Sequence, residues 1–293
     1  MSAAADEYLA ELAQQRLASP HTLAAYRRDL ALLQELLGGA APAAARQSQL
    51  RRALMQLHGR GLAPRSIART LSAWRGYYAW LARRGAIAAD PCNGLKAPKR
   101  PRPLPKALSP DQAQALLDRP GEDDLEFRDK AMFELFYSSG LRLAELAGLN
   151  VDAALDFAAG EVTVTGKRGK TRIVPVGQPA RDALDRWLEI RAGMAAAGEV
   201  ALFVNRRGQR LGHRSIERRL AAWARRSGLG VGVHPHMLRH SFASHLLQSS
   251  GDLRAVQELL GHASIAATQI YTHLDFQHLA KVYDAAHPRA RKK

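Results

Sequence analysis

The sequence predicts a mainly α-helical protein with a small antiparallel β-sheet, divided into two domains. Three observations support this fold class. Apolar residues recur at helical spacing through most of the 293 residues. The period changes to two residues only around 151–176. A segment rich in proline and basic residues, 88–108, interrupts both patterns. At this length each domain can bury a core of its own.

The first domain, residues 1–87, is predicted to be helical. Ser19-Pro20 is a typical helix start, and the apolar stretch after it stops at Gly38-Gly39. Two further helices are predicted at about 47–58 and 64–84. The last of these has arginines away from its apolar face: Arg65, Arg69, Arg75, Arg83 and Arg84. They form either a solvated charged surface or one that faces DNA, and the basic excess of this part of the chain favours the second.

Residues 88–108 are predicted to be an extended basic linker, because repeated proline prevents helix formation. The second domain, 109–293, begins at Ser109-Pro110, another helix start. The runs E-V-T-V-T and T-R-I-V-P-V predict a β-hairpin with Lys167 at its tip. Further helices are predicted at 180–197, 214–227 and 237–248.

The charge balance indicates a polyanionic partner. The chain has 43 basic and 27 acidic side chains, a net charge of +16, and its first 108 residues contain 17 basic against 6 acidic residues. Such an excess suits nucleic acid, whose phosphates attract lysine and arginine, although a generally arginine-rich composition is an alternative. The single cysteine, Cys92, excludes an internal disulfide and suits a reducing compartment. With no signal peptide or membrane span in the sequence, we expect a cytoplasmic protein without membrane insertion.

Six residues are predicted to form a site for chemistry at a phosphodiester. They are two arginines, a lysine, two histidines and a tyrosine: Arg142, Lys167, His236, Arg239, His262 and Tyr271. This chemistry needs a nucleophile, neutralisation of transition-state charge and a proton for the leaving oxygen. Arginine suits neutralisation because its planar fork binds two phosphate oxygens. Glu145, three positions after Arg142, is expected to hold that guanidinium. The sequence has no phosphate-binding loop, and no cofactor or metal is expected.

The order of these motifs resembles the tyrosine recombinase (phage integrase) family. The motifs are L-R-L-A-E-L, the hairpin G-K, H-M-L-R-H-S-F-A, L-L-G-H and Y-T-H. The resemblance spans nearly the whole chain, since residues 1–87 are similar to that family's helical core-binding (SAM-like) domain. Within the Xer branch of the family, the run from Leu259 to Ala290 is similar to the XerC subfamily rather than to XerD.

The resemblance implies a role for each site residue. Tyr271 would attack the scissile phosphate, forming a 3′-phosphotyrosine and releasing a 5′-hydroxyl. The two arginines would bind the non-bridging oxygens, and His262 would donate a further hydrogen bond. Lys167 would protonate the leaving 5′-oxygen, while His236 would assist proton transfer at the tyrosine. A phenol with an ordinary pKa of about 10 needs such neighbours in order to attack at neutral pH.

The resemblance also implies an assembly. The two domains would close around double-stranded DNA as a C-shaped clamp, and a tetramer with a XerD-like partner would hold two duplexes. Each C-terminal helix would dock on a neighbouring subunit, and strand exchange would proceed through a Holliday junction. The implied task is the resolution of chromosome dimers at cell division, under control of the FtsK translocase.

Three other functions remain open from the sequence. A type IB topoisomerase would use the same cleavage and religation steps, but would not need a subunit-docking tail. A metal hydrolase would use His236 and His240 as ligands, but Met237 stands where a zincin has glutamate and Arg239 would lie beside the cation. A DNA-binding protein without catalysis would lack covalent attachment to DNA.

Overall fold

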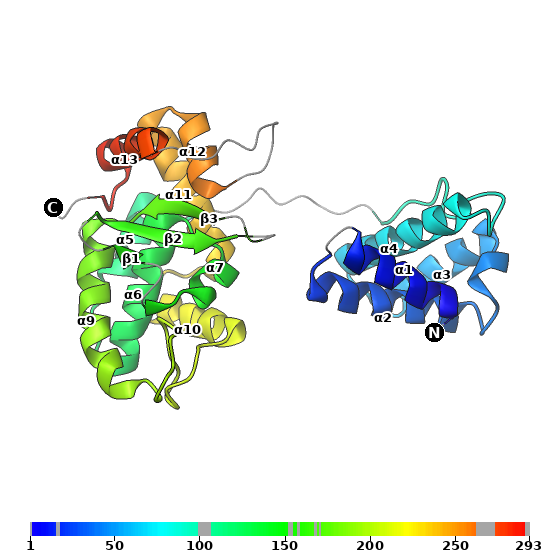
Figure 1. Ribbon diagram of the computed structural model, residues 1–293, viewed down its shortest axis with the longest axis horizontal. Coiled ribbons are helices and arrows are strands. Elements are labelled where there is room, and N and C mark those ends of the chain that lie inside the picture. Colours follow the sequence, from blue (N-terminus) through cyan, green and yellow to red (C-terminus); the bar gives the residue numbers. More distant parts are fainter. Residues whose placement is uncertain are drawn as a thin grey trace. The chain divides into compact units, whose positions relative to one another are not determined.

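The structure is a computed structural model, and it describes residues 2–15, 18–98, 107–151, 155–156, 159–166, 169, 171–261 and 273–290. For residues 155, 273–278 and 280 it describes the backbone only. The chain divides into two compact units, Met1–Arg102 and Pro103–Lys293, each of which is described separately (Figure 1). No helix in the described ranges is long and apolar enough to cross a membrane.

The first unit is helical, as predicted. Its helices are α1 (Ala3–Gln14), α2 (Pro20–Leu36), α3 (Gln47–Gly59) and α4 (Pro64–Arg83), with a short 3-10 turn at Pro42–Ala44. The Ser19 side chain accepts a hydrogen bond from the Thr22 amide and so caps α2. The apolar face of α4 is the centre of the core, with Trp74 and Tyr78 fully buried.

The arginines of α4 lie off its apolar face, as predicted, but three of the five have partners within the chain. Arg69 forms an ion pair with the buried Asp29. Arg75 donates to the Leu95 carbonyl. Arg84 pairs with Glu7 at 2.7 Å and lies over the Trp80 ring. These contacts hold α1, α2 and the segment after α4 together, so part of this basic surface stabilises the unit itself.

The first part of the predicted linker packs on the first unit. Cys92 and Leu95 are 1% and 3% exposed and belong to its core. Burial raises the pKa of the Cys92 thiol to about 12. Residues 85–98 therefore form a strap across the helices, residues 99–106 lie outside the described ranges, and Leu108 is buried in the second unit.

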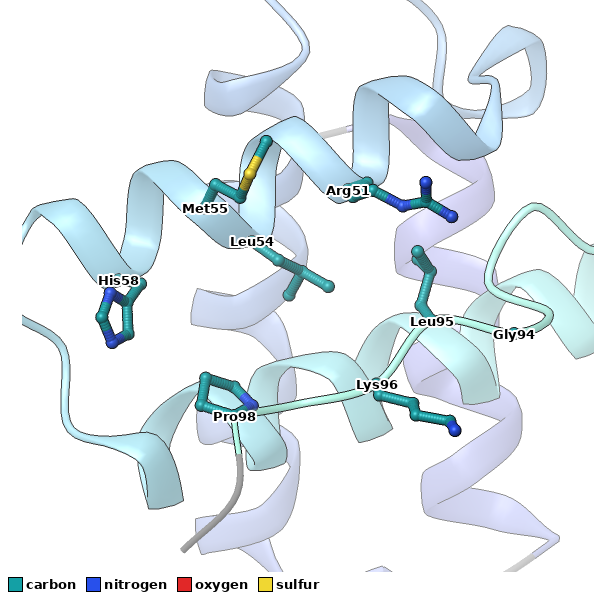
Figure 2. A pocket seen from close by; sticks show the side chains of 8 residues that line it. All are labelled: Arg51, Leu54, Met55, His58, Gly94, Leu95, Lys96 and Pro98. Atoms are coloured by element: carbon teal, nitrogen blue, oxygen red, sulfur yellow. The ribbon is translucent and has the colours of Figure 1, made fainter.

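A hollow separates α3 from this strap (Figure 2). Its lining combines apolar and basic side chains with one glycine: Leu54, Met55, Leu95, Pro98, Arg51, His58, Lys96 and Gly94. Met55 is 62% exposed. All residues of the predicted site lie in the other unit.

The second unit is built around one buried helix. Its elements begin with α5 (Pro110–Asp118), α6 (Asp124–Ser139) and α7 (Leu143–Gly148). After the sheet come α9 (Gln178–Met194), α10 (His213–Arg226), α11 (Pro235–Ser250), α12 (Leu253–Leu260) and α13 (His273–Ala286). Most of α6 is buried, and α9 and α11 pack along it (Figure 1). Gly140 ends α6 with a positive φ of 57°, and α7 follows at once.

The predicted hairpin is part of a three-stranded antiparallel sheet. Its order is β1 (Leu155–Asp156), β2 (Glu161–Thr165) and β3 (Thr171–Pro175). The register pairs Val162 with Val174 and Val164 with Arg172. Because side chains alternate between the faces of a strand, the inward face of this hairpin includes Arg172, which is 8% exposed.

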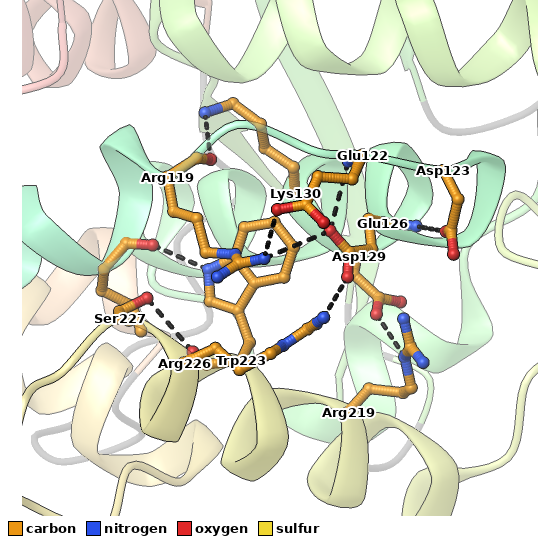
Figure 3. A network of polar contacts seen from close by, with 11 residues as sticks. Arg119, Glu122, Asp123, Glu126, Asp129, Lys130, Arg219, Trp223, Arg226 and Ser227 are labelled. Carbon is orange, nitrogen blue, oxygen red and sulfur yellow. Dashed lines mark hydrogen bonds and ion pairs between the residues drawn. The ribbon is translucent and has the colours of Figure 1, made fainter.

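Ion pairs join α10 to the first two turns of α6 (Figure 3). Arg219 contacts Asp129 and Arg226 contacts Glu126, and both carboxylates are buried. Between them the Trp223 indole donates to the Leu116 carbonyl at 2.7 Å. Buried carboxylates need such partners, because burial disfavours their charged form. This network fixes α10 against the core on the side away from the sheet.

The C-terminal segment packs on its own unit. Leu279 and Tyr283 are buried against α11 and α12, and the Tyr283 hydroxyl lies 2.8 Å from Ser138 Oγ on α6. The Gln178 amide donates to the Ala290 carbonyl. A Cβ at Gly177 would lie 1.8 Å from the Arg289 carbonyl oxygen, so only glycine permits this approach. The described part of the segment expected to dock on a neighbouring subunit thus makes both apolar and polar contacts with its own unit.

Candidate active site

Arg142 lies where α6 turns into α7, and Glu145 holds it as predicted. The Arg142 amide donates to Glu145 Oε2 at 2.8 Å, which caps α7, and its Nη1 donates to Oε1 at 2.6 Å. The Arg142 side chain is 38% exposed, whereas that of Glu145 is 3% exposed. The carboxylate therefore fixes a guanidinium that still faces solvent.

A further arginine, Arg172 of β3, binds the same carboxylate and was not predicted. Its Nη1 and Nη2 donate to Glu145 Oε1 and Oε2 at 2.7 and 2.9 Å, and its Nε donates to the Leu259 carbonyl at 3.0 Å. The sequence held a signal for it: in T-R-I-V-P, Arg172 shares the strand face of the buried Val174, while Ile173 is 43% exposed. An inward arginine on a strand requires a buried anion.

Arg239 comes from the first turns of α11 and is 8% exposed. Its Nη1 donates to the Gly140 carbonyl and its Nη2 to the Leu260 carbonyl. Arg142 Nη2 donates to the Gly261 carbonyl at 3.2 Å. Arg172 donates to the Leu259 carbonyl, so three consecutive carbonyls at the end of α12 each accept a hydrogen bond from a different arginine. The two predicted arginines are therefore brought together at one point, where α6, α11 and α12 meet.

The electrostatics of this cluster favour an anion. Burial raises the pKa of Glu145, but hydrogen bonds and charge from Arg172 and Arg142 outweigh it and hold the pKa at about 2. Burial, and then the charge of Arg142, lower the pKa of Arg239 to about 10, which leaves it protonated at neutral pH. Among the described residues, Glu145 is the one carboxylate paired with this cluster, and it pairs with Arg142 and Arg172, whereas Arg239 binds backbone carbonyls. The cluster has a net positive charge that a phosphate can neutralise.

Of the four remaining site residues, the structure describes only His236. His236 is exposed at the first turn of α11, three positions before the buried Arg239. Lys167, His262 and Tyr271 lie outside the described residues. Of the six predicted site residues, the structure thus brings Arg142 and Arg239 together and places His236 on the same helix as Arg239.

Two other histidines of the H-P-H-M-L-R-H-S-F-A-S-H run are structural. The His234 side chain caps α11 by accepting from the Met237 amide. His245 is buried, with its ring nitrogens 2.8 Å from the Tyr137 hydroxyl and 2.9 Å from the Leu108 carbonyl. Within the described part of the chain, no group of three or more histidine, cysteine or acidic side chains could hold a metal ion. The metal-hydrolase alternative has no support there.

Comparison with known proteins identifies the family. The model of the phage integrase family matches residues 106–278, and that of the phage integrase N-terminal SAM-like domain matches residues 5–85. The chain belongs to the phage integrase family. Family membership confirms the predicted fold class and the predicted activity, the breaking and rejoining of DNA strands.

Relatives of this family resemble the chain over nearly its full length. "Tyrosine recombinase XerC" of Chromobacterium violaceum is 57% identical over 276 residues, which is 94% of this chain and 91% of that protein. "Tyrosine recombinase XerC 1" of Ralstonia nicotianae is 55% identical over 309 residues, covering 98% of this chain and 93% of that protein. The predicted resemblance to the XerC subfamily is thereby confirmed.

Solved structures show the same architecture. A crystal structure of XerA recombinase covers 98% of this chain and 100% of its own, with 26% identity and a TM-score of 0.51. The XerH site-specific recombinase bound to a palindromic difH substrate covers 96% of this chain and 84% of its own, with 22% identity and a TM-score of 0.71. At this identity the second comparison shows the fold alone.

The low pKa of Glu145 predicts a loss of stability in acid. Its pKa in the folded chain, about 2, is below its ordinary value of 4.5. The carboxylate therefore stabilises the fold fully above pH 4.5, and the contribution disappears as the pH falls from 4.5 towards 2. The difference corresponds to on the order of 3 kcal/mol. Denaturant unfolding of the wild type and Glu145→Gln across this range should give curves that converge in acid; parallel curves would contradict the ion-pair network.

Proposed function

We propose that this chain is a XerC-type recombinase that exchanges DNA strands at a specific site and resolves chromosome dimers at cell division. Cleavage would proceed through a 3′-phosphotyrosyl intermediate at Tyr271, and exchange through a Holliday junction. The proposal is supported by 53–57% identity to several XerC proteins over almost the whole chain and by the order of the six site residues.

The observation on which the proposal rests is the arginine cluster around Glu145. Arg142 and Arg239 come from separate elements, are anchored to neighbouring carbonyls, and exceed the nearby negative charge. Arginine forks fixed in this way can bind the two non-bridging oxygens of one phosphate. Because they are already in place, they stabilise the charge that develops in the transition state without reorganising.

The reaction conserves the energy of the bond that it breaks. The Tyr271 oxygen would form a bond to phosphorus while the bond from phosphorus to the 5′-oxygen breaks. Lys167 would supply a proton to that oxygen, His236 would assist removal of the phenol proton, and His262 would hydrogen-bond the phosphate. Attack by the released 5′-hydroxyl of another strand would restore the diester and the phenol. No nucleotide cofactor is needed for this exchange.

The proposed DNA substrate is supported by solved relatives, and the proposed protein partners come from the resemblance to the Xer branch. The XerH structure is bound to a palindromic difH substrate and a lambda integrase dimer to a COC′ core site, and we propose double-stranded DNA with a recombination site as the substrate here. We further propose a heterotetramer with a XerD-like recombinase, control by the FtsK translocase and a cytoplasmic location. The proposed domains are residues 1–87 and 109–293, which would close around the duplex as a clamp. The first part of the segment between them, 88–108, packs on the first unit.

The proposal is tested by trapping the intermediate. The purified chain is incubated with a duplex that contains a candidate recombination site and a nick next to the cleavage position, so that the short fragment diffuses away and cannot religate. We expect a protein–DNA adduct on a denaturing gel and a peptide map that places it at Tyr271. An adduct formed only after a XerD-like partner is added would show that assembly controls cleavage. No adduct in either condition would indicate a protein that binds DNA without cleaving it.

A further inference from the structure

Arg172 is almost completely buried, and each of its three nitrogens has a partner. Its three polar groups bind Glu145 Oε1, Glu145 Oε2 and the Leu259 carbonyl, and its side chain is 7% exposed. Three of its five N–H donors are thus engaged within the protein, and little of the side chain reaches solvent. This geometry suits an effect on the reaction through the groups that Arg172 holds.

The groups that Arg172 binds are linked to both of the predicted arginines, Arg142 and Arg239. Glu145 positions Arg142, and the Leu259 carbonyl belongs to the same turn of chain whose next two carbonyls bind Arg239 and Arg142. We propose that Arg172 is a positioning residue of the recombinase site, which locks the Glu145 carboxylate and the end of α12 so that Arg142 and Arg239 face one phosphate. This inference rests on the proposed function.

The backbone after α12 is adapted to Arg172. Gly261 ends the helix with a φ of 61°, and a Cβ there would lie 3.1 Å from Arg172 Cδ and 3.3 Å from its Nε. The Gly261 backbone therefore packs closely against the Arg172 side chain. The hairpin strand β3, which is 87 residues away from Leu259 in sequence, in this way fixes the end of α12.

Loss of Arg172 should weaken the hold of Glu145 on Arg142. Burial opposes the charged carboxylate, and Arg172 supplies the largest compensation, followed by Arg142. The groups that face Glu145 are the guanidiniums of Arg142 and Arg172, with the charge of Arg239 adjacent. Without Arg172 the pKa of Glu145 should rise, and a protonated Glu145 would no longer orient Arg142. Lysine cannot replace Arg172 fully, because a single ammonium cannot span both carboxylate oxygens and the carbonyl.

Single-turnover cleavage of the nicked duplex by the full chain tests the inference. The variants are Arg172→Lys, Arg172→Gln and Glu145→Gln, together with Glu145→Gln combined with Arg172→Gln. The matched control is Arg128→Lys. Arg128 is 2% exposed, binds the Asp129 carboxylate and the Val204 carbonyl, and lies on α6. It thus reproduces the burial and bonding of Arg172 away from the site. DNA affinity and thermal unfolding are measured for each protein.

We expect Arg172→Gln to lower the cleavage rate by on the order of 100-fold and Arg172→Lys by about 10-fold, with DNA affinity retained. The deficit of Arg172→Gln should widen as the pH is lowered, since Glu145 then becomes protonated. The double variant should cleave at most about twofold more slowly than Glu145→Gln, because both substitutions act through the same carboxylate. Arg128→Lys should lose thermal stability and keep the wild-type rate.

Two results would overturn the inference. One is that the cleavage rates of the Arg172 variants fall no further than the rate of Arg128→Lys and depend on pH as the wild-type rate does. The other is a fully additive loss in the double variant, which would separate Arg172 from Glu145. Failure of the wild-type chain to form an adduct both alone and with a XerD-like partner would refute the proposed function, and this failure is recognised before any substitution is made.

Discussion

Replacing Tyr271 by phenylalanine should abolish covalent attachment to DNA and leave DNA binding nearly unchanged. The change removes one oxygen atom, the proposed nucleophile, and no other side chain in the site can form the same ester. Binding depends instead on many contacts between basic side chains and phosphates. The measurement is adduct formation on the nicked duplex, together with a binding titration at fixed salt concentration.

A matched control is Tyr26→Phe, a half-buried tyrosine that packs on the core of the other unit. It should form the adduct at the wild-type rate. Equal loss of binding and of attachment in Tyr271→Phe would contradict the assignment of the nucleophile, and an adduct that persists in this variant would place the nucleophile elsewhere.

Replacing Arg239 should have the second largest effect. Alanine would remove a buried charge beside the phosphate and leave the carbonyls of Gly140 and Leu260 without their donor. Loss of one donor to a transition-state oxyanion costs about 10²- to 10³-fold in rate, and each unsatisfied buried carbonyl costs about 1–3 kcal/mol of stability. We therefore expect Arg239→Ala to be both inactive and less stable.

Arg239→Lys separates the two effects. Lysine retains the charge but cannot donate to both carbonyls and to a phosphate at once, so the cleavage rate should still fall by about 10²-fold, while less stability is lost. The control is Arg254→Lys, which changes an 82% exposed arginine on α12 that pairs with Glu258. Single-turnover cleavage at the wild-type rate by Arg239→Lys would show that the fork of Arg239 is not needed.

The sequence predicted those features that depend on neighbouring residues. Ser19-Pro20 and Ser109-Pro110 begin helices because a serine cap and a proline act within one turn. The hairpin was predicted from its alternation, and the contact between Arg142 and Glu145 from their spacing of three. Each of these features requires only a few consecutive residues.

Contacts between segments that are distant in the chain could not be predicted from local sequence patterns. Arg172 is 27 residues from Glu145 in sequence and 87 from Leu259, so no local pattern joins them, and only the inward register of β3 indicated its burial. The packing of Cys92 on the first unit was hidden by the prolines around it, since proline excludes helix but not burial. The meeting of Arg142 and Arg239 was predicted from the charge neutralisation that a phosphodiester reaction needs, and the family resemblance then implied the same pair; no local pattern joins them.

The burial of Cys92 makes this protein well suited to labelling. The chain has one cysteine, which is 1% exposed and has its pKa raised to about 12, so almost none of it is the reactive thiolate at neutral pH. A cysteine introduced on the surface of each unit would therefore react with a maleimide dye while the native thiol stays unmodified. Distances between such dyes can report how the two units move on DNA, without first removing a residue from the core.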